Sequence, residues 1–117
     1  MSEIGGQLGF YEELQEQAEL VDGVLLELKS SEISRVKTGT LGTMLVSLGT
    51  ESWQSSPGRL ILILLGDFSR QRRRRWVEIG ERLLSGHVSN GEVQTLEKLA
   101  TALEAEQVSV MSRITGL

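Results

Sequence analysis

The sequence contains no cysteine and a single proline, Pro57. Without cysteine the chain cannot form a disulfide, a cysteine–zinc site or an iron–sulfur site, and it has no thiol nucleophile. This composition fits a reducing compartment. The longest apolar run, residues 60–65, is far shorter than the roughly 18 residues that span a bilayer, and the start of the chain lacks the pattern of a secretory signal. We therefore expect a cytoplasmic protein without a membrane span.

Residues that carry chemistry are also scarce. His87 is the only histidine, so histidines cannot form a metal cluster. The glycines do not form the GxxxxGK[ST] loop that cradles phosphates, and the carboxylates occur in runs typical of helix surfaces rather than as an acid–base pair. We therefore expect no enzymatic activity, no cofactor and no metal site.

Aromatic residues make up only 4% of the chain, and leucine dominates the apolar residues. Since strands favour β-branched and aromatic side chains, this composition favours helices. A chain of 117 residues is long enough for one domain. We expect a flexible segment at residues 1–9, followed by a single helical domain at residues 10–117.

Apolar residues recur at helical spacing in three long segments, residues 10–36, 57–85 and 89–114. A shorter pattern from Leu41 to Leu48 predicts a short helix ended by a glycine. The sequence therefore predicts an all-α bundle of three long helices and one short helix. Short strands near residues 43–48 and 60–65, which would make the fold α/β, are the alternative that the pattern leaves open.

Two of the expected helices begin with recognisable caps. Ser56 suits the N-cap of the second long helix, because Pro57 after it suits the first helical position. Ser89 and Glu92 have the spacing of a capping box, in which each side chain bonds the backbone amide of the other residue.

The last helix carries apolar residues at alternating spacings of three and four, with one polar residue among them. This is the pattern of a heptad seam, which packs against another helix of the same chain or against a second copy. The residues of this oligomer or packing seam are Val93, Leu96, Ala100, Leu103, Gln107, Val110 and Ile114.

The net charge is −4, but the charges are unevenly distributed. Residues 1–34 contain eight acids and one base, whereas residues 59–82 contain seven arginines and three acids. Such asymmetry means that the two segments attract each other, within one chain or between copies, or that the basic segment binds an external anion.

The arginines at residues 70–75 do not all fall on one face of a helix. Arg72 falls inside the apolar stripe, between Phe68 and Trp76. We expect its side chain to point inward and to pair with acids of the first helix, because a buried unpaired charge is very costly. The expected partner- or anion-binding patch consists of Arg70, Arg73, Arg74 and Arg75.

These features favour a protein–protein interaction domain that acts as an adaptor, regulator or structural subunit and associates with itself. The alternative is a nucleic-acid-binding regulator that uses the arginine-rich helix at residues 70–75. The acidic overall composition and the few aromatic residues near the arginines favour the first hypothesis.

Overall fold

The computed structural model describes residues 2–30 and 34–116, and these residues form helices and connecting turns without any strand. The all-α prediction is therefore confirmed, and the α/β alternative is wrong, because residues 43–48 and 60–65 are helical. The elements are α1 (Ser2–Lys29), α2 (Val36–Val46), the 3₁₀ turns η1 (Ser47–Gly49) and η2 (Trp53–Ser55), α3 (Arg59–Leu65), α4 (Arg70–Ser85) and α5 (Asn90–Thr115).

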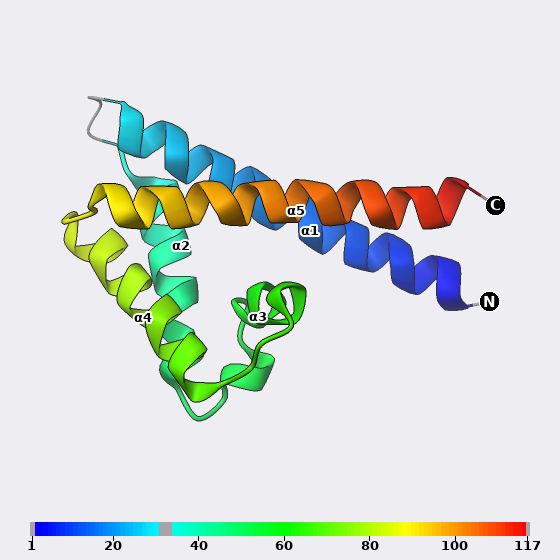
Figure 1. Cartoon of the computed structure of the whole chain (residues 1–117), viewed down its shortest axis with the longest axis horizontal. Coiled ribbons are helices and arrows are strands. Elements are labelled where there is room, and N and C mark those ends of the chain that lie inside the picture. The colour runs from blue at the N-terminus through cyan, green and yellow to red at the C-terminus, as the bar shows by residue number, and fades with distance from the viewer. Residues whose placement is uncertain (1, 31–33, 117) are drawn as a thin grey trace.

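The two longest helices, α1 and α5, lie against each other and run in opposite directions, so that both ends of the chain are at the same end of the pair (Figure 1). The shorter helices α2 and α4 form a second pair on one side of the first (Figure 1), and α3 contacts α5 and η2. The free end of the long pair extends beyond the other helices (Figure 1). No helix among the described residues is long and apolar enough to cross a membrane.

One hydrophobic core connects the helices. Leucine and valine residues at helical spacing contribute most of it, as the sequence pattern predicts. Among its fully buried members are Leu14 and Val21 of α1, Leu41 and Leu45 of α2, Ile61 of α3, Ile79 of α4, and Leu96, Leu103 and Val110 of α5.

The α2–α4 pair crosses at two glycines, Gly42 and Gly80. A Cβ atom on Gly80 would lie 2.8 Å from the Gly42 carbonyl oxygen and 2.9 Å from the Leu45 Cβ. Real Cβ atoms do not approach other atoms so closely, so the absence of a side chain at Gly80 lets the two backbones touch. This close approach fixes the position of α4, which carries the arginine run.

The first helix differs from its predicted bounds. It begins at Ser2 rather than at residue 10, and it ends at Lys29 rather than at residue 36. Val36, which the pattern assigned to the end of this helix, is the first residue of α2 and is 71% exposed.

The expected long helix at residues 57–85 is also wrong, because it is two helices. Gly66 has a φ of 68°, the left-handed conformation that favours glycine and ends a helix. After this break, Ser69 caps α4 by accepting a hydrogen bond from the Arg72 N–H at 3.1 Å. The expected start at Ser56 and Pro57 is wrong as well, since α3 begins at Arg59 with Gly58 as its N-cap.

The beginning of α2 is capped from a distance. No side chain caps α2 at its own N-cap, Arg35. Instead, the Glu27 carboxylate of α1 accepts hydrogen bonds from the backbone N–H groups of Lys37 at 3.1 Å and Thr38 at 2.9 Å. The Thr38 hydroxyl donates a third bond at 2.8 Å. Burial raises the pKa of Glu27, but these three bonds outweigh it and hold the pKa below its ordinary value.

The expected short helix corresponds to α2 and η1, and the last predicted helix corresponds to α5. The capping box at the start of α5 is also confirmed. In it the Ser89 backbone N–H donates to a Glu92 carboxylate oxygen at 3.1 Å.

Candidate interaction surfaces

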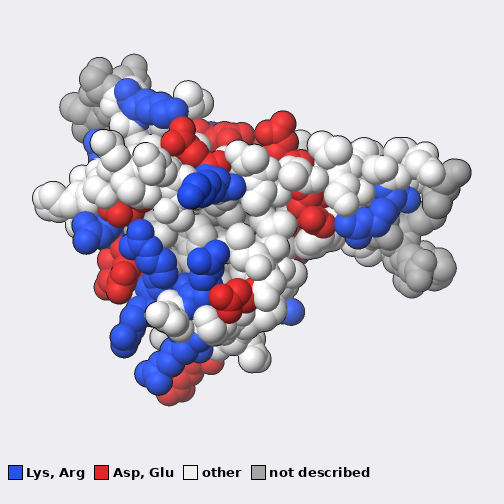
Figure 2. All heavy atoms as spheres, viewed as in Figure 1, with Lys and Arg blue, Asp and Glu red and all other residues white. Residues whose placement is uncertain are grey.

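The arginine run lies at the start of α4, where the helix projects toward solvent. Arginines gather over α4 in Figure 2, which has the same view as Figure 1, with a few acids among them. Arg70 and Arg74 are exposed, as expected, and form no ion pair among the described residues.

Arg72 is not inward, so this prediction is wrong: its side chain is exposed. The prediction treated residues 57–85 as one helix and carried the apolar stripe through Phe68. The break at Gly66 interrupts that stripe, which resumes only at the buried Trp76. Arg72 lies in the first turn of α4, before Trp76, which is the first residue of this helix to be buried in the core.

Arg73 is the least exposed arginine of the run, although the sequence placed it in the exposed patch. Its guanidinium carbon lies 4.5 Å from the centroid of the Trp53 ring, a cation–π contact. Trp53 in turn lies 6.1 Å, centroid to centroid, from Phe68. The start of α4 is thus joined to η2 through an aromatic residue.

Arg75 faces α5 and is paired. Its guanidinium lies 3.9 Å from a Glu78 oxygen and 3.8 Å from a Glu92 oxygen, while Arg82 Nε lies 3.7 Å from the other Glu92 oxygen. Glu92 is only 6% exposed. The hydrogen bonds from Ser89, assisted by Arg82 and Arg75, lower the pKa of Glu92 despite its burial. Arg75 is therefore a structural contact rather than a free member of the patch.

The seam of α5 is divided between buried and accessible residues. Leu96, Leu103 and Val110 are fully buried within this chain. Leu99, which the heptad spacing left out, is also buried at 2% exposure. The other seam residues, Val93, Ala100, Gln107 and Ile114, are partly exposed.

The acids of α1 form a strip that the sequence indicated only as a charge excess. Glu12, Glu16 and Glu19 follow at i, i+4 and i+7, so they lie on one face of the helix, and all three are exposed. None forms an ion pair among the described residues. Glu19 only accepts a hydrogen bond from the neutral Gln15 amide at 3.4 Å.

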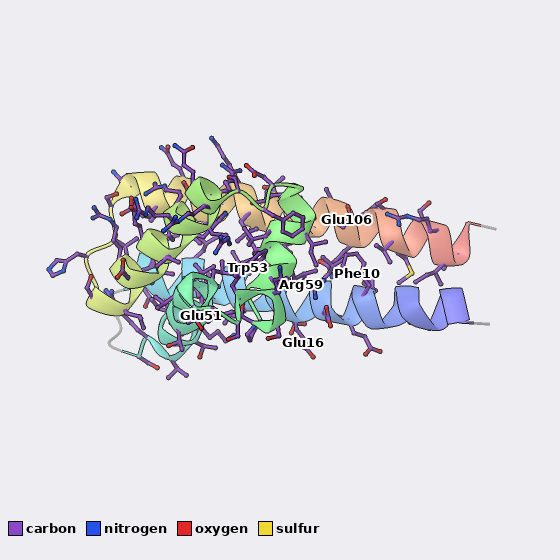
Figure 3. The ribbon with its side chains drawn as sticks, turned by 90° about the horizontal axis from the view of Figure 1, so that it is seen from below. Phe10, Glu16, Glu51, Trp53, Arg59 and Glu106 are labelled. Carbon is purple, nitrogen blue, oxygen red and sulfur yellow. The ribbon has the colours of Figure 1, made fainter. Side chains whose placement is uncertain are left out.

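Two adjoining hollows lie between α1, η2, α3 and the link to α4. The first, of about 410 Å³, is lined by Phe10 and acids of α1 on one side and by α3 on the other. The second, of about 500 Å³, is lined by Trp53, Gln54, Arg59 and Phe68, and Arg59 stands between the two. Figure 3 shows Arg59 between Trp53 and Phe10.

Sequence reasoning missed Trp53 and Phe68. Both lie in turns, where hydrophobic periodicity carries no information. One signal was present: Gly66 followed by Ser69, a helix stop followed by an N-cap residue, predicts a break that leaves Phe68 in a loop.

Within the described part of the chain, no three His, Cys, Asp or Glu side chains come close enough together to hold a metal ion. The chain matches no family model, no curated protein and no solved structure.

Proposed function

We propose that this chain is a protein–protein interaction domain that associates with further copies of itself and has a binding rather than a catalytic role, as an adaptor, regulator or structural subunit. One observation carries the proposal. The acidic strip of α1, Glu12, Glu16 and Glu19, and the basic strip of α4, Arg70 and Arg74, are both exposed and form no ion pair among the described residues.

Each strip destabilises the helix that carries it. Like charges at i, i+4 cost about 0.2 to 0.5 kcal/mol per pair, and Glu12 with Glu16 and Arg70 with Arg74 both have this spacing. A surface of opposite charge relieves this repulsion and speeds association. A second copy of the chain supplies the required surface for both strips at once.

The shape of the molecule supports the same proposal. Its accessible surface is 7237 Å², whereas a compact monomer of 12.9 kDa exposes about 6300 Å². Its radius of gyration is 14.7 Å, against about 13 Å for a compact domain of this length. Apolar side chains contribute to the excess, among them Val108 at 66% and Leu8 at 43% exposure, both on the projecting α1–α5 pair.

The experiment measures the mass in solution by analytical ultracentrifugation, at low and at high salt. We expect an oligomer that loses mass as salt rises, because salt screens exposed charges. The double variant Glu12→Lys, Glu16→Lys and the double variant Arg70→Glu, Arg74→Glu should each have the mass of one protomer. The control Glu51→Lys, Glu104→Lys makes the same change of net charge as Glu12→Lys, Glu16→Lys, but at exposed acids outside both strips, and it should remain associated.

Mixing the two double variants supplies the decisive result. In each variant alone the altered strip has the same sign of net charge as the unaltered strip. In a mixed pair, both contacts between α1 of one variant and α4 of the other join strips of opposite net charge. We expect the mixture to form a complex that contains both variants. A wild-type chain that stays a single protomer at all concentrations, or two variants that associate as the wild type does, would overturn the proposal.

A further inference from the structure

The hollow beside Trp53 has the lining of a binding site for a planar, negatively charged ligand. Its volume of about 500 Å³ lies within the range of about 300 to 1000 Å³ that small-ligand sites occupy. Two aromatic rings, an amide and a guanidinium line it, contributed by Trp53, Phe68, Gln54 and Arg59. These four side chains come from η2, α3 and the link between α3 and α4, so only the folded chain brings them together.

The aromatic rings leave one stacking surface open. Trp53 has Arg73 over its ring. Phe68 leans against Trp53 at an interplanar angle of 41°, and their centroids are too close to admit a third ring between them. Phe68 itself is 47% exposed. The surface that remains for a planar ligand is the exposed part of Phe68, whose ring packs on Trp53, which Arg73 in turn covers.

The polar side chains complete the chemistry. Gln54 is exposed and carries both a donor and an acceptor, which suits the edge of a nucleobase. Arg59 is exposed and forms no ion pair among the described residues, so its guanidinium is free to bind a phosphate.

We propose that this hollow binds a nucleobase with its attached phosphate, the base stacked on Phe68 and the phosphate at Arg59. Aromatic stacking beside a basic surface is the arrangement by which proteins bind single-stranded nucleic acid. The acids Glu13 and Glu16 line the adjoining hollow on the other side of Arg59 and repel phosphates. A strand leaving the base therefore runs away from these acids.

The experiment measures the binding of labelled single-stranded oligouridine or oligothymidine of about 10 nucleotides by fluorescence anisotropy, over a series of salt concentrations that begins near 50 mM. Phe68→Leu should weaken binding at least about fivefold, because stacking of one base contributes that much or more, and should leave the salt dependence unchanged. Phe68→Tyr keeps the stacking surface and should bind as the wild type does. Arg59→Gln should weaken binding and reduce the log–log salt slope by about 0.7, the value for one phosphate of a single strand.

The controls separate this site from general attraction of anions. Val108→Ala removes an exposed apolar side chain elsewhere, and Arg35→Gln removes an exposed arginine elsewhere. Both should bind the oligonucleotide as the wild type does. If unlabelled uridine monophosphate displaces the labelled oligonucleotide as well as the unlabelled oligonucleotide does, the base and phosphate come from a free nucleotide. Competition by the oligonucleotide alone identifies a strand.

Two results would overturn the proposal. One is the absence of any binding at the lowest salt. The other is a pair of findings: polyphosphate, which has no base, displaces the labelled oligonucleotide as well as unlabelled oligonucleotide does, and Phe68→Leu binds with unchanged affinity. Neither Phe68 nor Arg59 belongs to the charged strips assigned to self-association, so the failure of either proposal is distinguishable from the failure of the other.

Discussion

The long pair of helices, α1 and α5, and the short pair, α2 and α4, are held together by different means. In the long pair, branched side chains such as Leu14, Val21, Leu103 and Val110 are fully buried at helical spacing. In the short pair the contact runs through Gly42 and Gly80, where the two backbones touch. The long pair depends on side chains being present, whereas the short pair, which also buries side chains such as Leu45 and Ile79, additionally depends on a side chain being absent at its crossing.

This difference predicts opposite sensitivities to mutation. A leucine contact loses free energy when atoms are removed, because the side chain leaves a cavity. A glycine contact loses free energy when atoms are added, because the neighbouring backbone cannot move aside. Substitutions of both kinds test whether the two pairs differ as described.

The largest effect is expected for Leu103→Ala. Leu103 is fully buried in the core, so truncation should lower the free energy of unfolding by about 2 to 5 kcal/mol. Val108→Ala on the same helix removes atoms from a side chain that is 66% exposed. It should change the free energy of unfolding by less than about 0.5 kcal/mol. Urea denaturation measures both values. Equal losses would contradict the burial of Leu103.

Gly80→Ala should also destabilise, by about 1 to 3 kcal/mol. Its new Cβ would meet the Gly42 carbonyl oxygen and the Leu45 Cβ. Alanine is otherwise the better helix former by about 1 kcal/mol, so a loss of stability isolates the steric contact. The matched control is Gly39→Ala in α2, whose Cβ meets nothing within 4 Å. Gly39→Ala should stabilise the protein, and a stabilising effect of Gly80→Ala as well would show that α2 and α4 do not touch at Gly80.

The same contrast explains how much of the fold could be predicted from the sequence. Leucine and valine periodicity identified α5 and most of α1, because a stripe of large apolar residues is visible in the sequence. The crossing at Gly42 and Gly80 could not be predicted, since glycine adds nothing to a hydrophobic pattern. The start of α1 was missed for a related reason: Gly5, Gly6 and Gly9 are poor helix formers, and the helix exists there despite local propensity.

The candidate sites were predictable only where they lie on one helix. Arg70 and Arg74 are exposed as expected, because their positions follow from the period of α4 alone. Arg72 is exposed where the sequence predicts an inward side chain, and Arg73 is half-buried where the sequence predicts an exposed one. The reason is that the break at Gly66 changes which part of α4 reaches the core. The aromatic ring that Arg73 covers belongs to Trp53, in a turn distant in the sequence, which periodicity cannot place.

Two carboxylates join the long pair to the short pair, and their pKa values predict an acid-sensitive connection. Glu27 of α1 accepts hydrogen bonds from the start of α2, and Glu92 of α5 pairs with Arg75 and Arg82 of α4. The folded state lowers both pKa values below the usual 4.5. A lowered pKa means that the carboxylate stabilises the fold fully above the usual value and loses that contribution as the pH falls through the folded value.

We therefore expect the free energy of unfolding to fall as the pH decreases below about 4.5. Glu92→Gln should cost about 1 kcal/mol at neutral pH, the scale of a helix cap, and should make this decrease smaller. Glu104→Gln, at an exposed carboxylate with no ion pair among the described residues, should leave the decrease unchanged. Urea denaturation over a pH series measures all three proteins. A steeper decrease in Glu92→Gln would contradict the sign of its pKa shift.

The smallest effects concern the free end of the short pair, where the arginines differ by what lies beneath them. Arg72→Ala and Arg74→Ala should each change the free energy of unfolding by less than about 0.5 kcal/mol, because both side chains are exposed. Arg73→Ala should cost about 0.5 to 1 kcal/mol, because it removes the guanidinium from the Trp53 ring.

Arg73→Ala should also change the tryptophan fluorescence, because it uncovers the Trp53 ring. The other tryptophan, Trp76, is only 4% exposed and is not the ring that Arg73 covers, so the change reports on Trp53. Arg73→Lys keeps the charge but loses the planar stack, so its fluorescence should resemble that of Arg73→Ala. A larger loss for Arg72→Ala than for Arg73→Ala would show that Arg72, not Arg73, faces the core, and that α4 is rotated relative to the structure described.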